Sequence, residues 1–186
     1  MSNLVTALNG ASSEGYVSVQ EAPLTGMVTL RGEFDSAAFK KAVKEITGCD
    51  VPAQRMISHQ GDKSVGWMSP DELLVICAYE GANDVVAKFT SLMGEEHSLA
   101  VNVSDARARF VVSGNRVREV IAKLAPVDMT AFAEGELRRT RFSQEAAAFW
   151  MSDSQTVNVV CFRSVAEYIF KLLSLSSETG FEVGDF

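Results

Sequence analysis

The sequence predicts an α+β protein built from two similar halves, each with the element order β-α-β-β-α-β of a ferredoxin-like unit. A repeated motif is the first reason. "WMSPDELLVIC" begins at Trp67 and "WMSDSQTVNVVC" at Trp150, and these are the only two tryptophans in the chain. Each motif continues into a β-like run that ends in a cysteine, Cys77 or Cys161. We therefore expect an internal duplication in which the two tryptophans occupy equivalent sites.

The flanks of the motif repeat as well, which is the second reason. An apolar stretch ends at Gly32 in "VTLRG" and at Gly114 in "FVVSG". Each glycine is followed by apolar residues at helical spacing, which predicts an amphipathic helix. These residues are Phe39, Ala42, Val43 and Ile46 in the first half, and Val117, Val120, Ile121 and Leu124 in the second.

The remaining elements follow each cysteine. A second helix is predicted in both halves, from Val85, Val86, Phe89, Leu92 and Met93 and from Val165, Ile169, Leu172 and Leu173. The first half closes with the strand "SLAVNVSD". Its counterpart in the second half would be "GFEVGDF", residues 180–186, which is a weak strand pattern. The expected organisation is an N-terminal arm at 1–25 that need not be ordered, then halves at 26–105 and 106–186 in one compact body.

Composition excludes several classes of function. The chain has 186 residues, 47% of them hydrophobic, which is enough for a sizeable core without disulfides. A net charge of −7 argues against nucleic acid or an anionic membrane as the main partner, since both favour basic surfaces. No apolar run reaches membrane-spanning length. No Lys or Arg precedes Arg31, so neither a signal peptide nor a transit peptide is expected, and the predicted location is the cytoplasm.

Motifs for catalysis are absent from the sequence. It contains no G-x-G-x-x-G, no P-loop, no H-E-x-x-H and no G-x-S-x-G. The three cysteines lack C-x-x-C spacing, and we expect them to be buried thiols of a protein in a reducing compartment. His59 and His97 stand alone in polar stretches, so we expect no metal site. We assign no catalytic, cofactor-binding or metal-binding residue to this chain.

Arginine is unevenly distributed. Residues 106–141 contain eight basic and four acidic residues, whereas the remainder of the chain contains nine and twenty. By the alternation of a strand, Arg107 and Arg109 share one face in "ARARFVV", and Arg139 and Arg141 do so in "ELRRTRFS". Because arginine is enriched at protein interfaces, a partner interface or a polyanion site at Arg107, Arg109, Arg138, Arg139 and Arg141 is one interpretation. A solvated surface balanced by nearby acids is the other.

The same residues carry a family resemblance. The segments "GWMSPDELLVI", "VNVSDARARFVVSGNRVREVIAKLAPVDM", "RTRFSQEAAAFW" and "CFRSVAEYIFKLL" together resemble the gamma subunit of heterotetrameric sarcosine oxidase. The resemblance extends from about Gly66 to Leu173. Where the family pattern often has a second aromatic residue after Asp-Glu, this chain has Leu73, a conservative departure.

The resemblance implies a fold similar to the folate-binding domain of aminomethyltransferases. It also implies an enzyme complex that demethylates sarcosine to glycine, transfers the one-carbon unit to tetrahydrofolate and produces hydrogen peroxide. By that resemblance, FAD, FMN, NAD and the folate site belong to the alpha and beta subunits, and zinc to the delta subunit. This chain would then be a non-catalytic structural subunit whose arginines help to dock the large subunits.

Two alternatives remain open. The chain could itself bind folate, with arginines meeting the glutamate tail through charge-assisted hydrogen bonds, or it could act alone as an aminomethyltransferase-like enzyme. Which N-methyl amine the complex prefers does not follow from the sequence. An arginine-rich surface with an apolar backing is also expected to favour self-association of the isolated chain.

Overall fold

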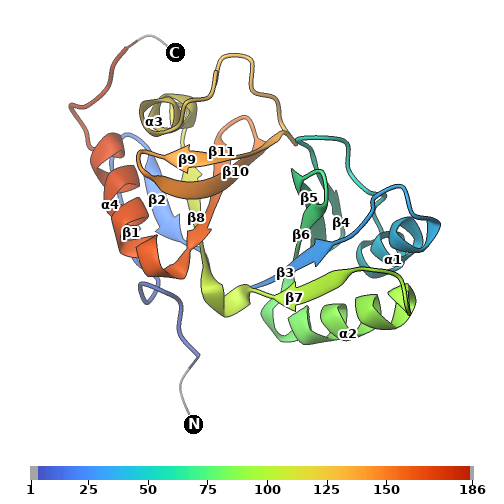
Figure 1. Ribbon diagram of the computed structural model, residues 1–186. Coiled ribbons are helices and arrows are strands. Elements are labelled where there is room, and N and C mark those ends of the chain that lie inside the picture. Colours follow the sequence, from blue (N-terminus) through green and yellow to red (C-terminus); the bar gives the residue numbers. More distant parts are fainter. Residues whose placement is uncertain (1–3, 185–186) are drawn as a thin grey trace. The chain divides into compact units, whose positions relative to one another are not determined.

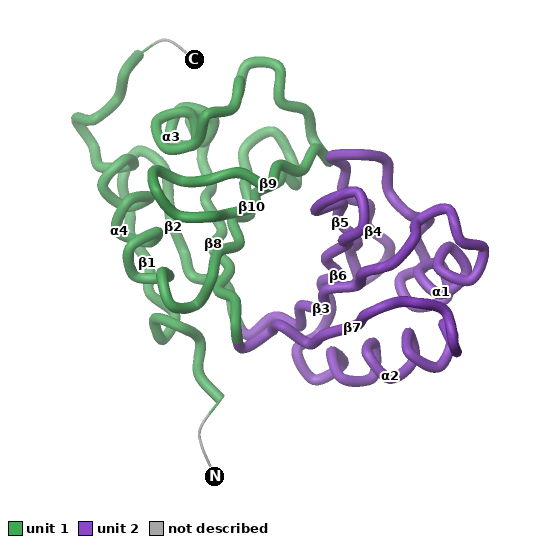
Figure 2. Tube along the Cα trace, in the orientation of Figure 1, with its two compact units in different colours: residues 1–23, 106–186 green, residues 24–105 purple. Residues whose placement is uncertain are grey.

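The computed structural model describes residues 4–184, and the chain folds into two compact units (Figures 1 and 2). Unit 2 consists of residues 24–105. Unit 1 combines residues 106–186 with the N-terminal segment 1–23. Each unit has its own antiparallel sheet and its own apolar core.

The sheet of unit 2 has five strands in the order β4-β5-β6-β3-β7, and every neighbouring pair is antiparallel. Helices α1 and α2 both contribute apolar side chains to the core on one face of this sheet. Its elements are β3 (Thr25–Arg31), α1 (Ala37–Thr47), β4 (Ile57–Gln60), β5 (Lys63–Ser69), β6 (Glu72–Ala78), the 3₁₀ turn η1 (Tyr79–Gly81), α2 (Ala82–Met93) and β7 (Leu99–Asn102).

Helix α1 shows how local sequence sets these boundaries. The Ser36 hydroxyl accepts a hydrogen bond from the Phe39 amide at 3.3 Å and caps the first turn. Gly48 ends the helix with φ at 75°, a conformation that glycine adopts without steric cost. The apolar face between these caps contributes Phe39, Ala42, Val43 and Ile46 to the core, as the sequence predicts.

The sheet of unit 1 has six strands in the order β1-β2-β8-β11-β10-β9, again antiparallel throughout. Helices α3 and α4 pack on one face. The elements are β1 (Ser12–Ser13), β2 (Ser18–Glu21), β8 (Arg107–Ser113), α3 (Val117–Leu124), β9 (Leu137–Phe142), β10 (Glu145–Asp153), β11 (Thr156–Phe162), the 3₁₀ turn η3 (Arg163–Val165) and α4 (Ala166–Ser177). The 3₁₀ turn η2 (Ser104–Ala106) includes the last residues of unit 2 and the first residue of the second part of unit 1.

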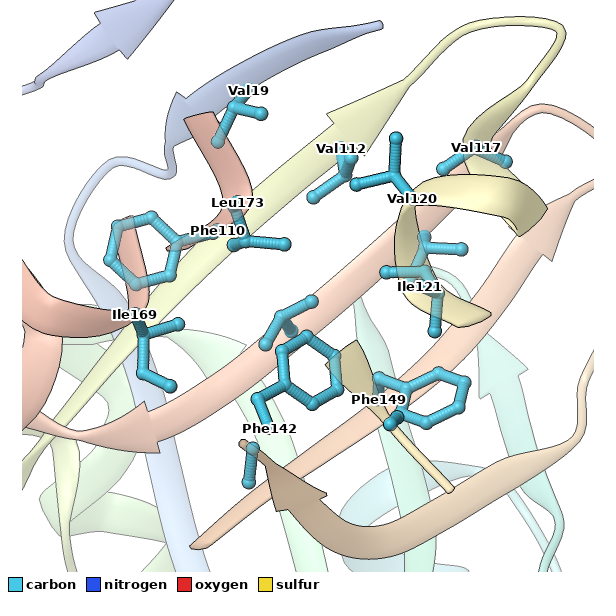
Figure 3. Close-up of a cluster of buried hydrophobic side chains, with 14 of the residues drawn as sticks. Val19, Phe110, Val112, Val117, Val120, Ile121, Phe142, Phe149, Ile169 and Leu173 are labelled. Atoms are coloured by element: carbon cyan, nitrogen blue, oxygen red, sulfur yellow. The ribbon is translucent and has the colours of Figure 1, made fainter. Parts of the chain in front are cut away.

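Figure 3 shows the core between the sheet and the helices of unit 1. Side chains from β2, β8, α3, α4, β9 and β10 meet there. The rings of Phe132 and Phe149 stack with their centroids 5.0 Å apart. Phe142 packs against Phe149 with a centroid distance of 5.7 Å. Full burial of each large apolar side chain contributes about 1.5–3 kcal/mol to folding.

The predicted α+β fold with two similar halves is confirmed. Strand β3 corresponds to β8, and the elements follow in the same order in both halves up to the second helix, α2 or α4; the closing strand β7 has no counterpart after α4. Unit 2 has one strand more than the four of a ferredoxin-like sheet, and unit 1 has two more, one of which is β1 beside β2. Strand β4 extends the sheet beside β5, and β9 does the same beside β10.

Two sequence-based expectations about the chain ends are wrong. The described part of residues 180–186 contains no strand. The position beside β8 is taken instead by β2, whose residues Ser18–Glu21 pair with Ser113–Phe110. Residues 1–25 are therefore no separate arm where the structure describes them, because β1 and β2 complete the sheet of unit 1 and β3 already begins at Thr25.

The two tryptophans are not equivalent either. Trp67 lies opposite Leu73, whereas the residue in the matching position of β10 is Met151, opposite Val157. A shift of one residue along a strand moves a side chain to the other face of the sheet. Trp67 therefore packs against the helix-side core of unit 2, while Trp150 lies on the helix-free face of its sheet and is only 3% exposed.

None of the described helices is both long and apolar enough to cross a membrane.

Candidate functional site

Four of the five predicted interface arginines share one face of the unit 1 sheet. In β8, Ala108, Phe110 and Val112 point into the core, so Arg107 and Arg109 lie on the opposite, helix-free face. In β9, Arg139 and Arg141 pair with Ala148 and Ala146 of β10, which lie on the same helix-free face because Ala147 and Phe149 are in the core. We call Arg107, Arg109, Arg139 and Arg141 the arginine face.

Cross-strand pairing aligns these residues in rows. Arg109 lies opposite Val160, Val160 opposite Ala148, and Ala148 opposite Arg139. The two arginines thus end one row whose centre is small and apolar. With a spacing of about 4.8 Å between strands, β8 and β9 are about 14 Å apart. The row therefore has an arginine at each end and only the uncharged residues Val160 and Ala148 between them.

The side chains on β8 are held by neighbours within the sheet. The guanidinium of Arg107 lies over the ring of Phe162, 4.1 Å from its centroid. Arg109 donates a hydrogen bond to the Asn158 side-chain oxygen at 2.9 Å, and Asn158 in turn donates to the Ser152 hydroxyl at 2.6 Å. Burial lowers the pKa of Arg109, but a guanidinium stays charged at neutral pH.

Arg138 does not belong to the arginine face. It lies opposite Phe149, so its side chain is on the helix side of the sheet. There it forms an ion pair with Glu136 and sits over the ring of Phe132, 5.4 Å from the centroid. Adjacent residues of a strand point to opposite faces of the sheet. Arg138 and its neighbour Arg139 in "ELRRTRF" therefore lie on different sides of β9.

A buried carboxylate, which sequence reasoning did not identify, joins α3 to both ends of unit 1. Glu119 is fully buried and forms ion pairs with Arg116 and Lys123. It also accepts hydrogen bonds from the Tyr16 hydroxyl at 3.2 Å and from the Val183 amide at 2.7 Å. Its only sequence signal is the i,i+3 and i,i+4 spacing to basic residues, which surface helices share.

Opposing effects set the pKa of Glu119. Burial of the carboxyl group raises its pKa, but hydrogen bonds from the Val183 amide, Lys123 and Arg116 outweigh this effect. The pKa therefore lies below its ordinary value, and Glu119 is charged at neutral pH. The cluster connects the side chain of Tyr16 and the main chain of Val183 to the same helix.

The three cysteine thiols are buried, whereas the two histidines are exposed. Burial raises the pKa of Cys77, and it raises that of Cys161 to about 12, so neither thiol is ionised near neutral pH. Burial lowers the pKa of His59, whose Nδ1 lies 2.7 Å from the Ser64 hydroxyl. His97 is exposed. Within residues 4–184, no three His, Cys, Asp or Glu side chains come together as a set of metal ligands.

Comparison with known protein families decides the relationship. The model of the sarcosine oxidase, gamma subunit family matches residues 31–179. The chain belongs to this family. The match includes both copies of the Trp-Met-Ser motif and all five candidate interface arginines. No match is found among curated protein sequences.

Solved structures share the fold of this gamma subunit family member. A chain of the heterotetrameric sarcosine oxidase from Corynebacterium sp. U-96 is 20% identical, with a TM-score of 0.81 over 94% of this chain and 91% of that chain. Aminomethyltransferase T of the glycine cleavage system from Bartonella henselae is 7% identical, with a TM-score of 0.68 over 90% of this chain and 48% of that chain. At these identities the likeness shows the fold.

Proposed function

We propose that this chain is a non-catalytic, structural gamma subunit of a cytoplasmic heterotetrameric sarcosine oxidase. The observation that carries the proposal is the family match over residues 31–179, which covers most of both units. The partners would be the alpha, beta and delta subunits. The complex would demethylate sarcosine oxidatively to glycine, transfer the one-carbon unit to tetrahydrofolate and release hydrogen peroxide.

In this proposal the other subunits hold FAD, FMN, NAD and zinc, and supply the redox chemistry. The state of this chain's own reactive groups supports a structural role. The Cys161 thiol, with a pKa of about 12, is protonated and fully buried, so it is a poor nucleophile. The contribution of this chain would be a rigid surface that positions its partners.

The arginine face is the surface that we propose for docking a large subunit. Arg139 and Arg141 are exposed, lie on the same face of an edge strand, and can form bidentate pairs with carboxylates of a partner. The double variant Arg139→Glu/Arg141→Glu should weaken assembly by at least tenfold, because each reversal places like charges together. Lys41→Glu, a charge reversal at an exposed position of α1, is the control for a change of charge elsewhere on the chain.

Assembly can be measured by co-expressing the four subunits and determining the mass and yield of the complex by native mass spectrometry. Thermal unfolding of each isolated variant shows whether the fold is intact. If the double variant folds normally and assembles in full yield, the arginine face is not a docking surface.

A second candidate function is supported by the likeness to the aminomethyltransferase fold. The chain could bind a folate, whose glutamate tail would pair with arginines of the same face. Calorimetric titration of the isolated chain with tetrahydrofolate separates the two functions. Saturable binding that Arg109→Ala weakens would favour the folate module, and absence of heat at millimolar ligand would leave the structural role.

A further inference from the structure

The outer edge of β7 is open. On one side β7 pairs with β3, and no strand within residues 4–184 pairs with its other side. The corresponding strand of unit 1, β2, has its outer edge paired with β1. The duplicated fold thus has one covered edge and one uncovered edge at equivalent positions.

The backbone of β7 presents hydrogen-bonding groups to this edge. The Val103 amide donates to the Met27 carbonyl at 2.8 Å, which fixes the phase of the antiparallel ladder. Because bonded and non-bonded pairs alternate, Val101 and Leu99 exchange hydrogen bonds with β3. The amide and carbonyl groups of Ala100 and Asn102 therefore point away from β3, toward the open edge.

The side chains of β7 also differ from those of the other edge strands. Leu99 and Val101 are 50% and 39% exposed, and β7 contains neither charge nor proline. Edge strands are commonly protected by charged residues or by being very short. Strand β9 carries three arginines, β1 has two residues, and the exposed residues of β4 are polar. Among the described edges, β7 alone presents two large exposed apolar side chains.

An acidic cavity adjoins the start of β7. Its volume is about 860 Å³, and its lining is formed by Arg31, Gly32, Glu33, Asp71, Glu96, His97, Ser98 and Leu99. Arg31 forms ion pairs with Asp71 at 3.0 Å and with Glu72 at 2.7 Å. Glu33 and Glu96 form no ion pair with any described residue, although Glu96 accepts a hydrogen bond from Ser36. The cavity therefore has an excess of negative charge.

We infer that the β7 edge and this cavity together bind an extended, basic segment of another subunit. The main chain of the segment adds to the sheet beside β7 and bonds to Ala100 and Asn102. Apolar side chains of the segment cover Leu99 and Val101, and a Lys or Arg side chain enters the cavity between Glu33 and Glu96. The inference rests on the proposed function, because it takes the partner from the same complex.

Charge complementarity favours a basic partner over a second copy of this chain. Unit 2 contains seven basic and twelve acidic residues. Pairing of β7 with β7 across a two-fold axis would bring together two units that each carry this net negative charge, which is unfavourable. A segment that carries Lys or Arg would instead be attracted by the negative charge of unit 2.

Two edge variants test the strand pairing. Ala100→Pro removes an outward-pointing amide and leaves the ladder with β3 intact, since the Ala100 amide takes no part in it. Val101→Lys places a charge on the apolar edge strand. Leu175→Lys is the control, because Leu175 is also a large exposed apolar residue, 51% exposed, and lies on α4 of the other unit. We expect at least a tenfold loss of affinity for the other subunits from each edge variant, and none from the control.

The cavity is tested by Glu33→Lys/Glu96→Lys, with the exposed Glu80→Lys as control. The double variant should weaken assembly by at least tenfold and reduce its dependence on salt. Hydrogen exchange of the wild-type chain, free and in the complex, gives a readout that needs no variant. The amides of Ala100 and Asn102 should become protected on assembly.

The outcomes separate the two proposals. Assembly of the wild-type complex with unprotected β7 amides and unaffected edge variants would overturn the inference and leave the proposed function standing. Failure of the wild-type chain to join the other subunits would overturn both. Self-association of the free chain that Val101→Lys abolishes, with no β7 protection in the complex, would assign the edge to a second copy and also overturn the inference.

Discussion

Replacing Glu119 with alanine should loosen both ends of unit 1 at once. The carboxylate is fully buried between Arg116 and Lys123 and accepts the amide of Val183. Lys123 also donates to the Tyr16 hydroxyl at 2.7 Å and to the Phe181 carbonyl at 2.6 Å. Without Glu119, two positive charges remain together beside a main-chain amide that has lost its acceptor.

The size of the expected loss in stability depends on how exposed the side chains of Arg116 and Lys123 are to water. Removing one member of a fully buried ion pair costs about 3–5 kcal/mol. The side chains of Lys123 and Arg116 are 20% and 38% exposed, so each recovers part of its hydration. We expect Glu119→Ala to lower the free energy of unfolding by about 2–3 kcal/mol, which for a chain of this length lowers Tm by about 4–12 °C.

Glu167→Ala on α4 is the matched control, because Glu167 forms the same i,i+4 pair with Lys171 but is 70% exposed. Its replacement should change stability far less, because water and salt screen an exposed ion pair. Both values can be measured by calorimetry and urea unfolding at pH 7. Equal stability of the two variants would refute the claim that the buried cluster stabilises unit 1.

The contribution of Glu119 to stability should also depend on pH, and the direction of the change can be predicted. The folded-state pKa of Glu119 lies below its ordinary value, so its contribution is present above the unfolded carboxyl pKa of about 4.3. The contribution is lost as pH falls through the lower pKa of the folded state. The stability difference between wild type and Glu119→Gln should therefore shrink below about pH 4. A difference that persists unchanged at low pH would show that the charge of Glu119 is irrelevant.

Three further predictions concern the core and the termini. Phe149→Ala should cost about 3–5 kcal/mol in urea unfolding, because a fully buried ring that contacts Phe132 and Phe142 is removed; a cost below 1 kcal/mol would contradict this packing. Cys161 should resist Ellman's reagent at pH 8 until the protein unfolds, since its pKa of about 12 leaves about one thiolate in ten thousand; rapid labelling of native protein would disprove its burial. Val19→Asp should make the chain insoluble or strongly destabilised, because Val19 is fully buried in β2. Gln20→Asp, on the exposed side of that strand, should be tolerated. Equal solubility of the two variants would contradict the place of β2 in the sheet.

The helices could be predicted from the sequence because their signals are local. The apolar spacing of Phe39, Ala42, Val43 and Ile46 specifies which face of α1 is buried, whatever the rest of the chain does. Alternation in "ARARFVV" likewise places Arg107 and Arg109 on one face of β8. Both predictions needed only a few neighbouring residues.

The pairing of distant segments could not be predicted in this way. Strand β2 has four residues and completes a sheet about ninety residues away in sequence, so no local pattern relates it to β8. The Trp-Met-Ser motif recurs in the sequence, but its second copy is shifted by one residue relative to the strand hairpin. Trp67 therefore lies on the helix side of its sheet, and Trp150 lies on the helix-free side of its own sheet. A count of charges along the sequence groups Arg138 with Arg139 and Arg141, because it ignores the face of the strand on which each side chain lies.

The membership of this chain in a multi-subunit oxidase is tested most directly by native mass spectrometry of the four co-expressed subunits. If the chain is a structural subunit, the spectrum shows one complex that contains it in equal stoichiometry with the alpha, beta and delta subunits, and the yield of this complex falls when the chain is omitted. A fully assembled, active oxidase without this chain, together with a free gamma chain that never joins it, would show that the chain is not a subunit.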